Sequence, residues 1–186
     1  MSIMNSLRFG YLAYLSKPQA DRTFYRLLRK QPVRSIVEMG IGSGVRTRRM
    51  FEVLQQYHSG EKVRYTGIDP FELRPEGSQR LSLKQAFTTL SAPNVKLQLL
   101  PGDPFMALSR AANGLKDTDL VIIAADQTGE ALDRAWFYLP RMLHEGSQVF
   151  LEQPGAKPEE TVFRVVTRLE IERLANAKHQ ATRRAA

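Results

Sequence analysis

The hydrophobic and polar positions along the chain follow two periods, one typical of short strands and one typical of helices. Alternating or continuously apolar segments predict strands over residues 35–38, 63–69, 94–100, 120–125 and 148–151. Apolar residues three or four positions apart predict helices that end at about residue 30 and that span about 45–57, 81–90, 105–112 and 129–143. The stretch 120–125 is apolar throughout, which is typical of a parallel strand covered on both faces.

Strand and helix alternate through five rounds, which predicts an α/β fold with a doubly wound, mostly parallel sheet and helices on both faces. No linker or internal repeat divides the 186 residues, so a single domain over 1–186 is expected. Within it, residues 1–30 are predicted to form a helical N-terminal cap and 179–186 a basic tail. For 159–178 we predict mostly helix, and the alternative is a sixth strand over 163–169 followed by a short helix over 171–178.

Composition excludes several classes of site. The chain has no cysteine, which rules out disulfides and cysteine-based zinc sites. Its three histidines are far apart and show no ligand spacing, so no metal site is predicted, with Mg²⁺ on carboxylates left as the alternative. No signal peptide and no apolar run of the ~20 residues that a membrane span needs is found, so a cytoplasmic protein without membrane contact is expected.

The net charge of +8 is concentrated near the two ends of the chain. Such basic ends attract nucleic acid or anionic substrates, although a solvated basic surface is the interpretation that we prefer. The basic cluster Arg46, Arg48 and Arg49 is likewise expected to face outward from its helix. Nothing in the sequence defines the oligomeric state.

The most informative motif lies where the first strand ends. Glu38 is followed by Gly40, Gly42 and Gly44, and a helix is predicted from Val45. Glycine permits positive φ and leaves no Cβ between the backbone and a ligand. A pyrophosphate would be repelled by the preceding carboxylate, whereas a ligand with a cationic amine and hydroxyls would be favoured. The spacing also fails the dinucleotide and P-loop patterns, so it favours S-adenosylmethionine over NAD or ATP.

Four acids follow the predicted strands at or near their carboxyl ends: Glu38, Asp69, Asp103 and Asp126. Ligands of doubly wound sheets bind outside these ends, near the point where the strand order reverses. The four acids are therefore expected at one edge of the sheet. Simpler explanations are a tight glycine turn without a ligand, a turn at Asp69 before Pro70, and helix caps at Asp103 and Asp126.

Over about residues 20–152 the chain resembles the class I S-adenosylmethionine-dependent methyltransferases, which have a Rossmann-like fold. The resemblance rests on the glycine motif at 37–44 and on the segment 65–69, which matches the second strand of that family. It implies that Gly40, Gly42 and Gly44 lie against the methionine part and the ribose of the cofactor. It also implies that Glu38 lies near the cofactor amine, directly or through water.

The same resemblance assigns the remaining cofactor contacts. Asp69 would accept hydrogen bonds from the ribose hydroxyls, and Pro70 and Phe71 would lie beside the adenine. Asp103 would accept from the adenine amino group. Asp126 would belong to the cofactor site as well, and it is the one candidate for catalysis, with helix capping as the preferred alternative.

The resemblance implies a methyltransferase that uses S-adenosylmethionine on a small-molecule acceptor. Other interpretations are a catalytically silent S-adenosylmethionine-binding or scaffold protein, and an RNA-associated methyltransferase that uses its basic ends. The catalytically silent alternative has support in the sequence because no recognisable catalytic base follows the strands predicted over 120–125 and 148–151. Residues 1–30 would then be the natural cover of the substrate site.

Overall fold

A computed structural model describes residues 3–74, 81–157 and 159–184, and the side chains of 6–74, 81–157 and 159–177. Its centre is a six-stranded sheet in the order β3-β2-β1-β4-β5-β6. The strands are β1 (Ser35–Met39), β2 (Val63–Asp69), β3 (Val95–Pro101), β4 (Thr118–Ile123), β5 (Leu143–Pro154) and β6 (Thr161–Val165). All neighbouring pairs are parallel except β5 and β6. The strand order reverses between β1 and β4, as a doubly wound sheet requires.

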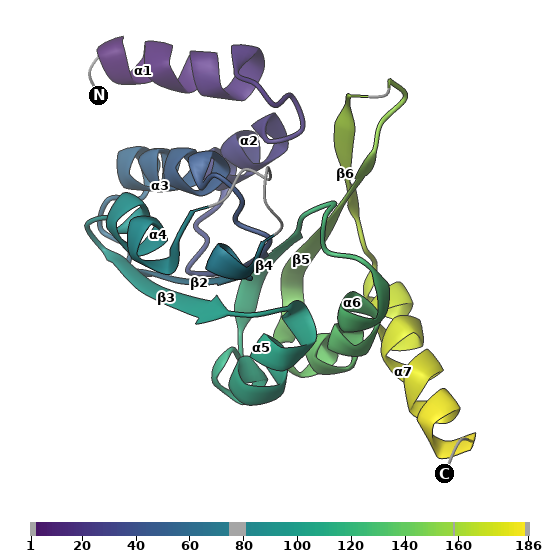
Figure 1. Cartoon of the computed structure of the whole chain (residues 1–186). Helices are drawn as coiled ribbons and strands as arrows, with labels where there is room; N and C mark the ends of the chain where they lie inside the picture. Colours follow the sequence, from purple (N-terminus) through teal and green to yellow (C-terminus); the bar gives the residue numbers. More distant parts are fainter. Residues whose placement is uncertain (1–2, 75–80, 158, 185–186) are drawn as a thin grey trace.

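Helices cover both faces of this sheet (Figure 1). One face carries α1 (Ile3–Gly10), a π-helical turn (Tyr11–Leu15), α2 (Arg22–Lys30), α3 (Val45–Tyr57) and α4 (Leu83–Leu90). The other carries α5 (Pro104–Ala111), α6 (Gly129–Ala135), a 3-10 helix (Trp136–Arg141) and α7 (Arg168–Arg184). Two further 3-10 turns span Phe71–Leu73 and Ala112–Gly114. The predicted α/β fold class is thereby confirmed.

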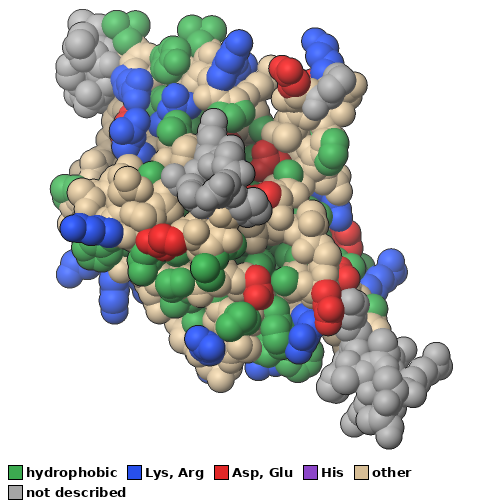
Figure 2. Space-filling model, in the orientation of Figure 1, with side chains coloured by type: hydrophobic (Ala, Val, Ile, Leu, Met, Phe, Trp, Pro, Cys, Tyr) green, Lys and Arg blue, Asp and Glu red, His purple; other side chains and the backbone are tan. Residues whose placement is uncertain are grey.

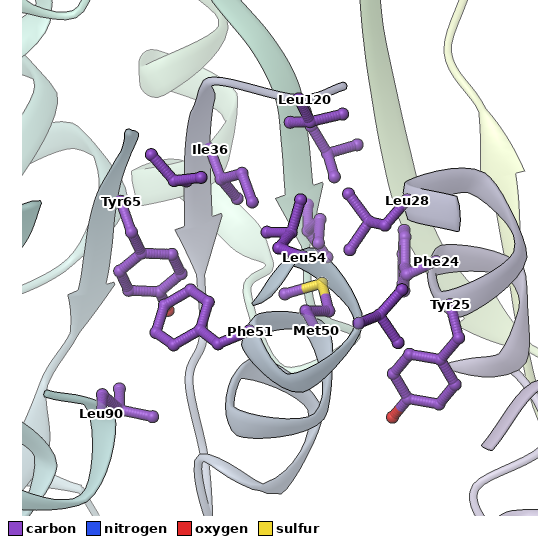
Figure 3. Close-up of a cluster of buried hydrophobic side chains, with 14 of the residues drawn as sticks. Phe24, Tyr25, Leu28, Ile36, Met50, Phe51, Leu54, Tyr65, Leu90 and Leu120 are labelled. Atoms are coloured by element: carbon purple, nitrogen blue, oxygen red, sulfur yellow. The ribbon is translucent and has the colours of Figure 1, made fainter. Parts of the chain in front are cut away.

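Each face of the sheet has its own hydrophobic core because successive side chains of a strand point to opposite faces. In β1, Ile36 packs with the helices of the first face, and Val37 packs with those of the second. Figure 3 shows the first core, in which Phe24 of α2 and Phe51 of α3 lie against side chains of the sheet. This packing holds α2 and α3 against the first face of the sheet.

The region after β5 differs from the prediction. Residues 159–178 were expected to be mostly helical, but Thr161–Val165 forms the edge strand β6, and a helix begins only at Arg168. The prediction was wrong because this β-branched segment pairs with β5 in antiparallel register, and Phe163 packs edge-on against Phe24. The alternative of a sixth strand followed by a helix is closer. The helix α7 also takes in residues 179–184 of the predicted basic tail, and 185–186 lie outside the described residues.

A second difference concerns the helix predicted over 129–143. It ends at Ala135 and continues as a 3-10 helix that contains Pro140. Proline lacks an N–H donor and disfavours the α conformation of the residue before it, so the segment forms the tighter 3-10 helix instead of continuing as an α-helix. Strand β5 then starts earlier and ends later than predicted, and its far end pairs with β6. Figure 1 shows these paired ends extending past the rest of the sheet.

Candidate functional site

The glycine turn joins β1 to its two neighbours in the sheet. The N–H of Gly40 donates to the carbonyl of Ile68 at 2.8 Å, and Ala124 donates to Met39 at 2.9 Å. Gly40 has a φ of +87°, and a Cβ there would lie 2.7 Å from the Cβ of Ala124. Gly42 has a φ of +59°, but a Cβ there would meet nothing within 4 Å. Gly40 is therefore required by close packing, whereas Gly42 presents an open backbone surface.

Asp69, at the end of β2, fixes the conformation of this turn. One carboxylate oxygen accepts the backbone N–H groups of Ile41 and Gly42 at 2.8 and 3.1 Å. The other accepts from the N–H of Phe71, and Arg74 donates to both oxygens. Burial acts to raise the pKa of Asp69, but these hydrogen bonds outweigh it, so the pKa is lowered and the group stays ionised. The hydrogen bond from Phe71 shows the turn that was the alternative interpretation of Asp69, whereas its contact with a ribose stays a prediction.

Glu38 is fully buried beneath the glycine turn. It accepts from Arg46 at 2.8 Å and from the hydroxyl groups of Thr47 and Tyr65, both at 2.7 Å. Burial and the adjacent charge of Glu38 raise the pKa of Tyr65 well above its ordinary value, so its phenol remains a donor. A buried carboxylate requires such partners because its desolvation is costly. Glu38 thus organises the interior of the site.

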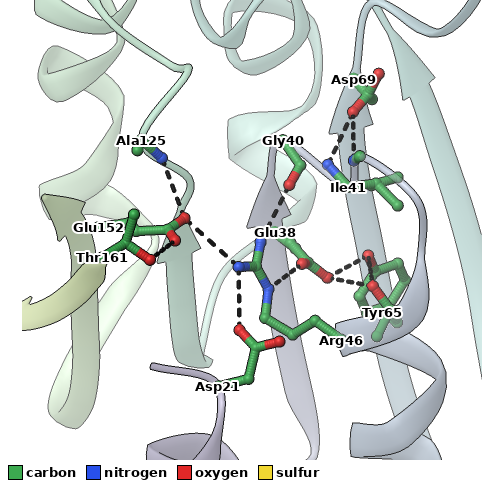
Figure 4. A network of polar contacts seen from close by, with 12 residues as sticks. Asp21, Glu38, Gly40, Ile41, Arg46, Tyr65, Asp69, Ala125, Glu152 and Thr161 are labelled. Carbon is green, nitrogen blue, oxygen red and sulfur yellow. Dashed lines mark hydrogen bonds and ion pairs between the residues drawn. The ribbon is translucent and has the colours of Figure 1, made fainter. Parts of the chain in front are cut away.

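Arg46 is the residue that joins the site together, and the prediction that it faces outward was wrong. Its side chain is only 11% exposed and lies between three acids, Glu38, Asp21 at 3.5 Å and Glu152 at 3.6 Å (Figure 4). It also donates to the carbonyl of Gly40 at 3.2 Å. Burial alone would lower the pKa of Arg46, but the neighbouring acids raise it above its ordinary value. The guanidinium is therefore a fixed positive charge.

Asp21 reaches this network from the segment before α2. It occupies the N-cap position of α2, yet its side chain accepts no capping hydrogen bond there. Burial raises the pKa of Asp21 to about 6. The charge of Arg46 acts to lower this pKa, and the charges of Glu38 and Glu152 act to raise it. Asp21 therefore titrates closer to neutral pH than an ordinary aspartate does.

A cavity of about 680 Å³ opens above this network, a volume suited to a small-molecule ligand. It lies at the point where the strand order reverses, between the turn after β1 and the segment after β4. The residues that line it are Lys17, Pro18, Asp21, Gly40, Ile41, Gly42, Ser43, Val45, Arg46, Arg74, Ala124, Ala125, Asp126 and Glu152.

Negative charge exceeds positive charge around this cavity. The wall contains three carboxylates, Asp21, Asp126 and Glu152, and three cations, Lys17, Arg46 and Arg74. Two further carboxylates, Glu38 and Asp69, are buried directly behind Arg46 and Arg74. Among the described residues in the wall and directly behind it, five carboxylates thus stand against three cations, and the excess of two negative charges favours a cationic ligand over a pyrophosphate.

The structure brings part of the predicted site to the cavity. Gly40, Gly42 and Asp126 line it, whereas Glu38 and Asp69 lie behind the two arginines. The other predicted residues do not line it: Gly44 is the N-cap residue of α3, Pro70 precedes a 3-10 turn, Phe71 is buried in the first core, and Asp103 caps α5.

The two proposed helix caps have different outcomes. Asp103 accepts the N–H of Met106 at 2.9 Å, which confirms it as the N-cap of α5. The cap proposed for Asp126 was wrong because α6 begins at Gly129 after the N-cap residue Thr128. Among the described residues Asp126 contacts the side chains of Arg74 and Gln127. Its carboxylate is half exposed and faces the cavity.

Four important residues were missed as site residues: Arg46, Arg74, Asp21 and Glu152. The helical pattern places Arg46 one residue after Val45, at the first turn of α3, where a long side chain reaches back over the strand end. This signal was available but was read as an outward face. The role of Arg74 depends on the turn after β2, and that of Asp21 depends on the packing of α2 against α3, which no local pattern reveals.

Comparisons with known proteins identify the fold. No family model matches the chain, and no curated protein matches it. Among solved structures, CalS11, described as a TDP-rhamnose 3′-O-methyltransferase of calicheamicin biosynthesis, matches at 17% identity over 81% of this chain and 77% of its own, with a TM-score of 0.53. Precorrin-6y C5,15-methyltransferase from Geobacter metallireducens matches at 16% identity over 76% of this chain, with a TM-score of 0.50. This chain spans 65% of the length of that structure.

The chain therefore has the Rossmann-like α/β fold of these methyltransferases, which is the fold that the sequence resemblance implied. Identities below 20% establish the fold alone, so the chemistry has to be argued from the site. Within the described residues, no helix is both long and apolar enough to cross a bilayer. The same residues contain no cluster of three or more potential metal ligands.

Proposed function

We propose that the protein binds S-adenosylmethionine in the cavity between the turn after β1 and the segment after β4. The observation that carries this proposal is the excess of carboxylates over cations around a cavity that is floored by the open backbone of Gly42. S-adenosylmethionine bears a sulfonium and an ammonium against one carboxylate, so it is a net cation. NAD and ATP carry a net negative charge and would be repelled there.

The residues that would hold the cofactor follow from this arrangement. Asp126, Asp21 and Glu152 supply acceptors for its amine and hydroxyls, and the backbone of Gly42 allows close approach. Asp69 contributes by fixing the N–H groups of the glycine turn, and its ribose contact would require Arg74 to move aside. Asp103 and Phe71 remain candidates for the adenine only if the ligand extends beyond the described cavity.

When bound, the cofactor would supply an electrophilic methyl group on sulfur, and we propose that the protein transfers it to a small-molecule acceptor. The two structural neighbours are named for a sugar nucleotide and for a precorrin, which supports a small acceptor here. The protein's own contribution is to position the two reactants and to exclude water. Asp21, with its pKa of about 6, and Asp126 are the carboxylates placed to accept a proton.

A second candidate function is binding without methyl transfer. It is favoured by the ion pairs that Arg46 and Arg74 form with the carboxylates of the cavity, because these pairs leave no unpaired carboxylate in the described wall to serve as a catalytic base. The experiment that separates the two functions is incubation with S-adenosylmethionine labelled in its methyl group and a fractionated pool of small molecules. Label found in an acceptor product supports transfer. Cofactor binding without any labelled product supports the silent protein.

A further inference from the structure

A second cavity lies on the other side of the ion-pair network, between α2 and the β5–β6 hairpin. It has a volume of about 290 Å³. Arg22, Thr23 and Arg26 of α2 form one wall, and Thr161 and Phe163 of β6 form the opposite wall. Figure 1 shows the hairpin of β5 and β6 beside α2. The cavity thus exists because residues 161–165 form a strand that pairs with β5.

The two arginines of this cavity are oriented by backbone carbonyl groups. Arg22 donates through Nε to the carbonyl of Ser16 at 2.7 Å, and Arg26 donates through Nη1 to the carbonyl of Ala13 at 3.1 Å. Within the described part of the chain, neither forms an ion pair with a carboxylate. A guanidinium has five N–H donors, so both arginines keep donors for a ligand in a fixed geometry.

The charge of this cavity is opposite to that of the first. Its wall contains the cations Arg22 and Arg26 against one carboxylate, Glu160, which leaves an excess of positive charge. The hydroxyl group of Thr23 lines the same space, accepts from Nη2 of Arg26 at 3.5 Å and keeps its own proton for a ligand. Guanidinium and hydroxyl donors together are the set that recognises a phosphate or a carboxylate.

The two cavities share a wall. Thr161, which lines the second cavity, donates to Glu152 of the first cavity at 2.6 Å. The guanidinium of Arg46 in the first cavity lies 5.4 Å from the ring centre of Phe163 in the second. Figure 4 shows Thr161, Glu152, Arg46 and Asp21 as one continuous network. A negatively charged site and a positively charged site therefore lie side by side.

We propose that the second cavity binds the anionic group of the methyl acceptor, a phosphate or a carboxylate, through Arg22 and Arg26. Its identity as an acceptor site rests on the proposed function, whereas anion binding can be tested by itself. A small anion fits better than a nucleic acid because acidic and basic side chains are interspersed on the face drawn in Figure 2, without a continuous basic stripe.

The test is calorimetric titration of the full chain with pyrophosphate and, separately, with malonate, which distinguishes a phosphate from a carboxylate site. We expect one of them to bind and Arg26→Gln to weaken that binding about 10- to 100-fold, the loss of a charge-assisted hydrogen bond. Arg26 also donates to the carbonyl of Ala13, so its replacement could affect folding as well as binding. A second pair of variants therefore tests the site without changing Arg26. Val162→Glu places a negative charge in the cavity wall, and Val165→Glu places one on the same exposed strand outside it.

Val162→Glu should abolish anion binding, and Val165→Glu should leave it unchanged. Equal loss in both variants, or no binding of either anion at about 10 mM, would overturn the proposed site. A single-stranded oligonucleotide provides a further test. The proposed site would also be overturned if the oligonucleotide bound more tightly than the small anions and if Arg48→Gln weakened its binding as much as Arg26→Gln did. Titration with S-adenosylhomocysteine in parallel separates the two proposals. If the anion binds and S-adenosylhomocysteine does not, only the proposed function is contradicted. If S-adenosylhomocysteine binds and neither anion does, only the anion site is contradicted.

Discussion

The Nε atom of Arg46 lies 2.8 Å from a carboxylate oxygen of Glu38, and this pair is buried between the glycine turn and the start of α3. Glu38 has no other cationic partner among the described residues, and Arg46 also contacts Asp21, Glu152 and the carbonyl of Gly40. The acid that precedes the glycines therefore acts through an arginine of this chain. Both the stability of the turn and the charge of the cavity depend on this pair.

Replacing Arg46 with methionine should destabilise the protein by about 3–5 kcal/mol, because it leaves the buried Glu38 without its counter-charge. Thermal or urea denaturation followed by circular dichroism measures the change. The matched control is Arg48→Met on the exposed face of the same helix, which should change the stability by less than about 0.5 kcal/mol. Equal effects of the two substitutions would show that the buried pair has no special role.

Alanine at the first two glycines of the turn should separate folding from binding. Gly40→Ala should lower stability by several kcal/mol, roughly the cost of overpacking plus positive-φ strain, because its Cβ would lie 2.7 Å from that of Ala124. Gly42→Ala meets no neighbour and should cost only about 1–2 kcal/mol of strain. Gly42→Ala should nevertheless weaken binding of S-adenosylhomocysteine, measured by calorimetry on the folded variant. Unchanged affinity would remove Gly42 from the proposed site.

The stability of the protein should depend on pH through Asp21. Its pKa is raised from 3.8 to about 6, so the folded state holds this proton more tightly than the unfolded state does. The contribution of Asp21 to stability therefore falls as the pH rises through that window. Relative to Asp21→Asn, the wild type should lose about 2 kcal/mol between pH 4 and pH 6. Denaturation curves at several pH values provide the measurement, and parallel pH profiles of the two proteins would contradict the raised pKa.

Asp103 offers a test of how far the ligand extends. Its side chain caps α5, so Asp103→Ala should cost about 1 kcal/mol, whereas Asp103→Asn should be nearly neutral because asparagine caps equally well. Both variants should bind S-adenosylhomocysteine as the wild type does if Asp103 is only a cap. A loss of affinity in the stable Asp103→Asn variant would instead support the adenine contact that the family resemblance implies.

Local patterns predicted most of the fold. Strand β2 and helix α3 lie where the alternation and the apolar spacing placed them, because each is bounded by a glycine turn or a polar loop. The hairpin of β5 and β6 was not predicted, since Thr161–Val165 acquires strand conformation by pairing with a distant segment and by the contact of Phe163 with Phe24.

The candidate site was predicted less completely than the fold. The glycines and the acids at the strand ends are local features, and Gly40, Gly42 and Asp126 do line the cavity. The arginines that cover Glu38 and Asp69 were missed because a charged residue is usually exposed, whether it lies on a helix, as Arg46 does, or after a turn, as Arg74 does. Their burial follows from tertiary contacts with carboxylates of other elements, which a single-sequence pattern does not contain.

The most direct test of the proposed function is isothermal calorimetry with S-adenosylmethionine, S-adenosylhomocysteine and NAD on the same preparation. We expect one molecule of each of the first two to bind per chain and NAD not to bind. S-adenosylmethionine should bind more tightly than S-adenosylhomocysteine, because its sulfonium charge is attracted by the excess of carboxylates around the cavity. The absence of binding by both S-adenosyl compounds to the folded protein, or tighter binding of NAD, would contradict the proposed function.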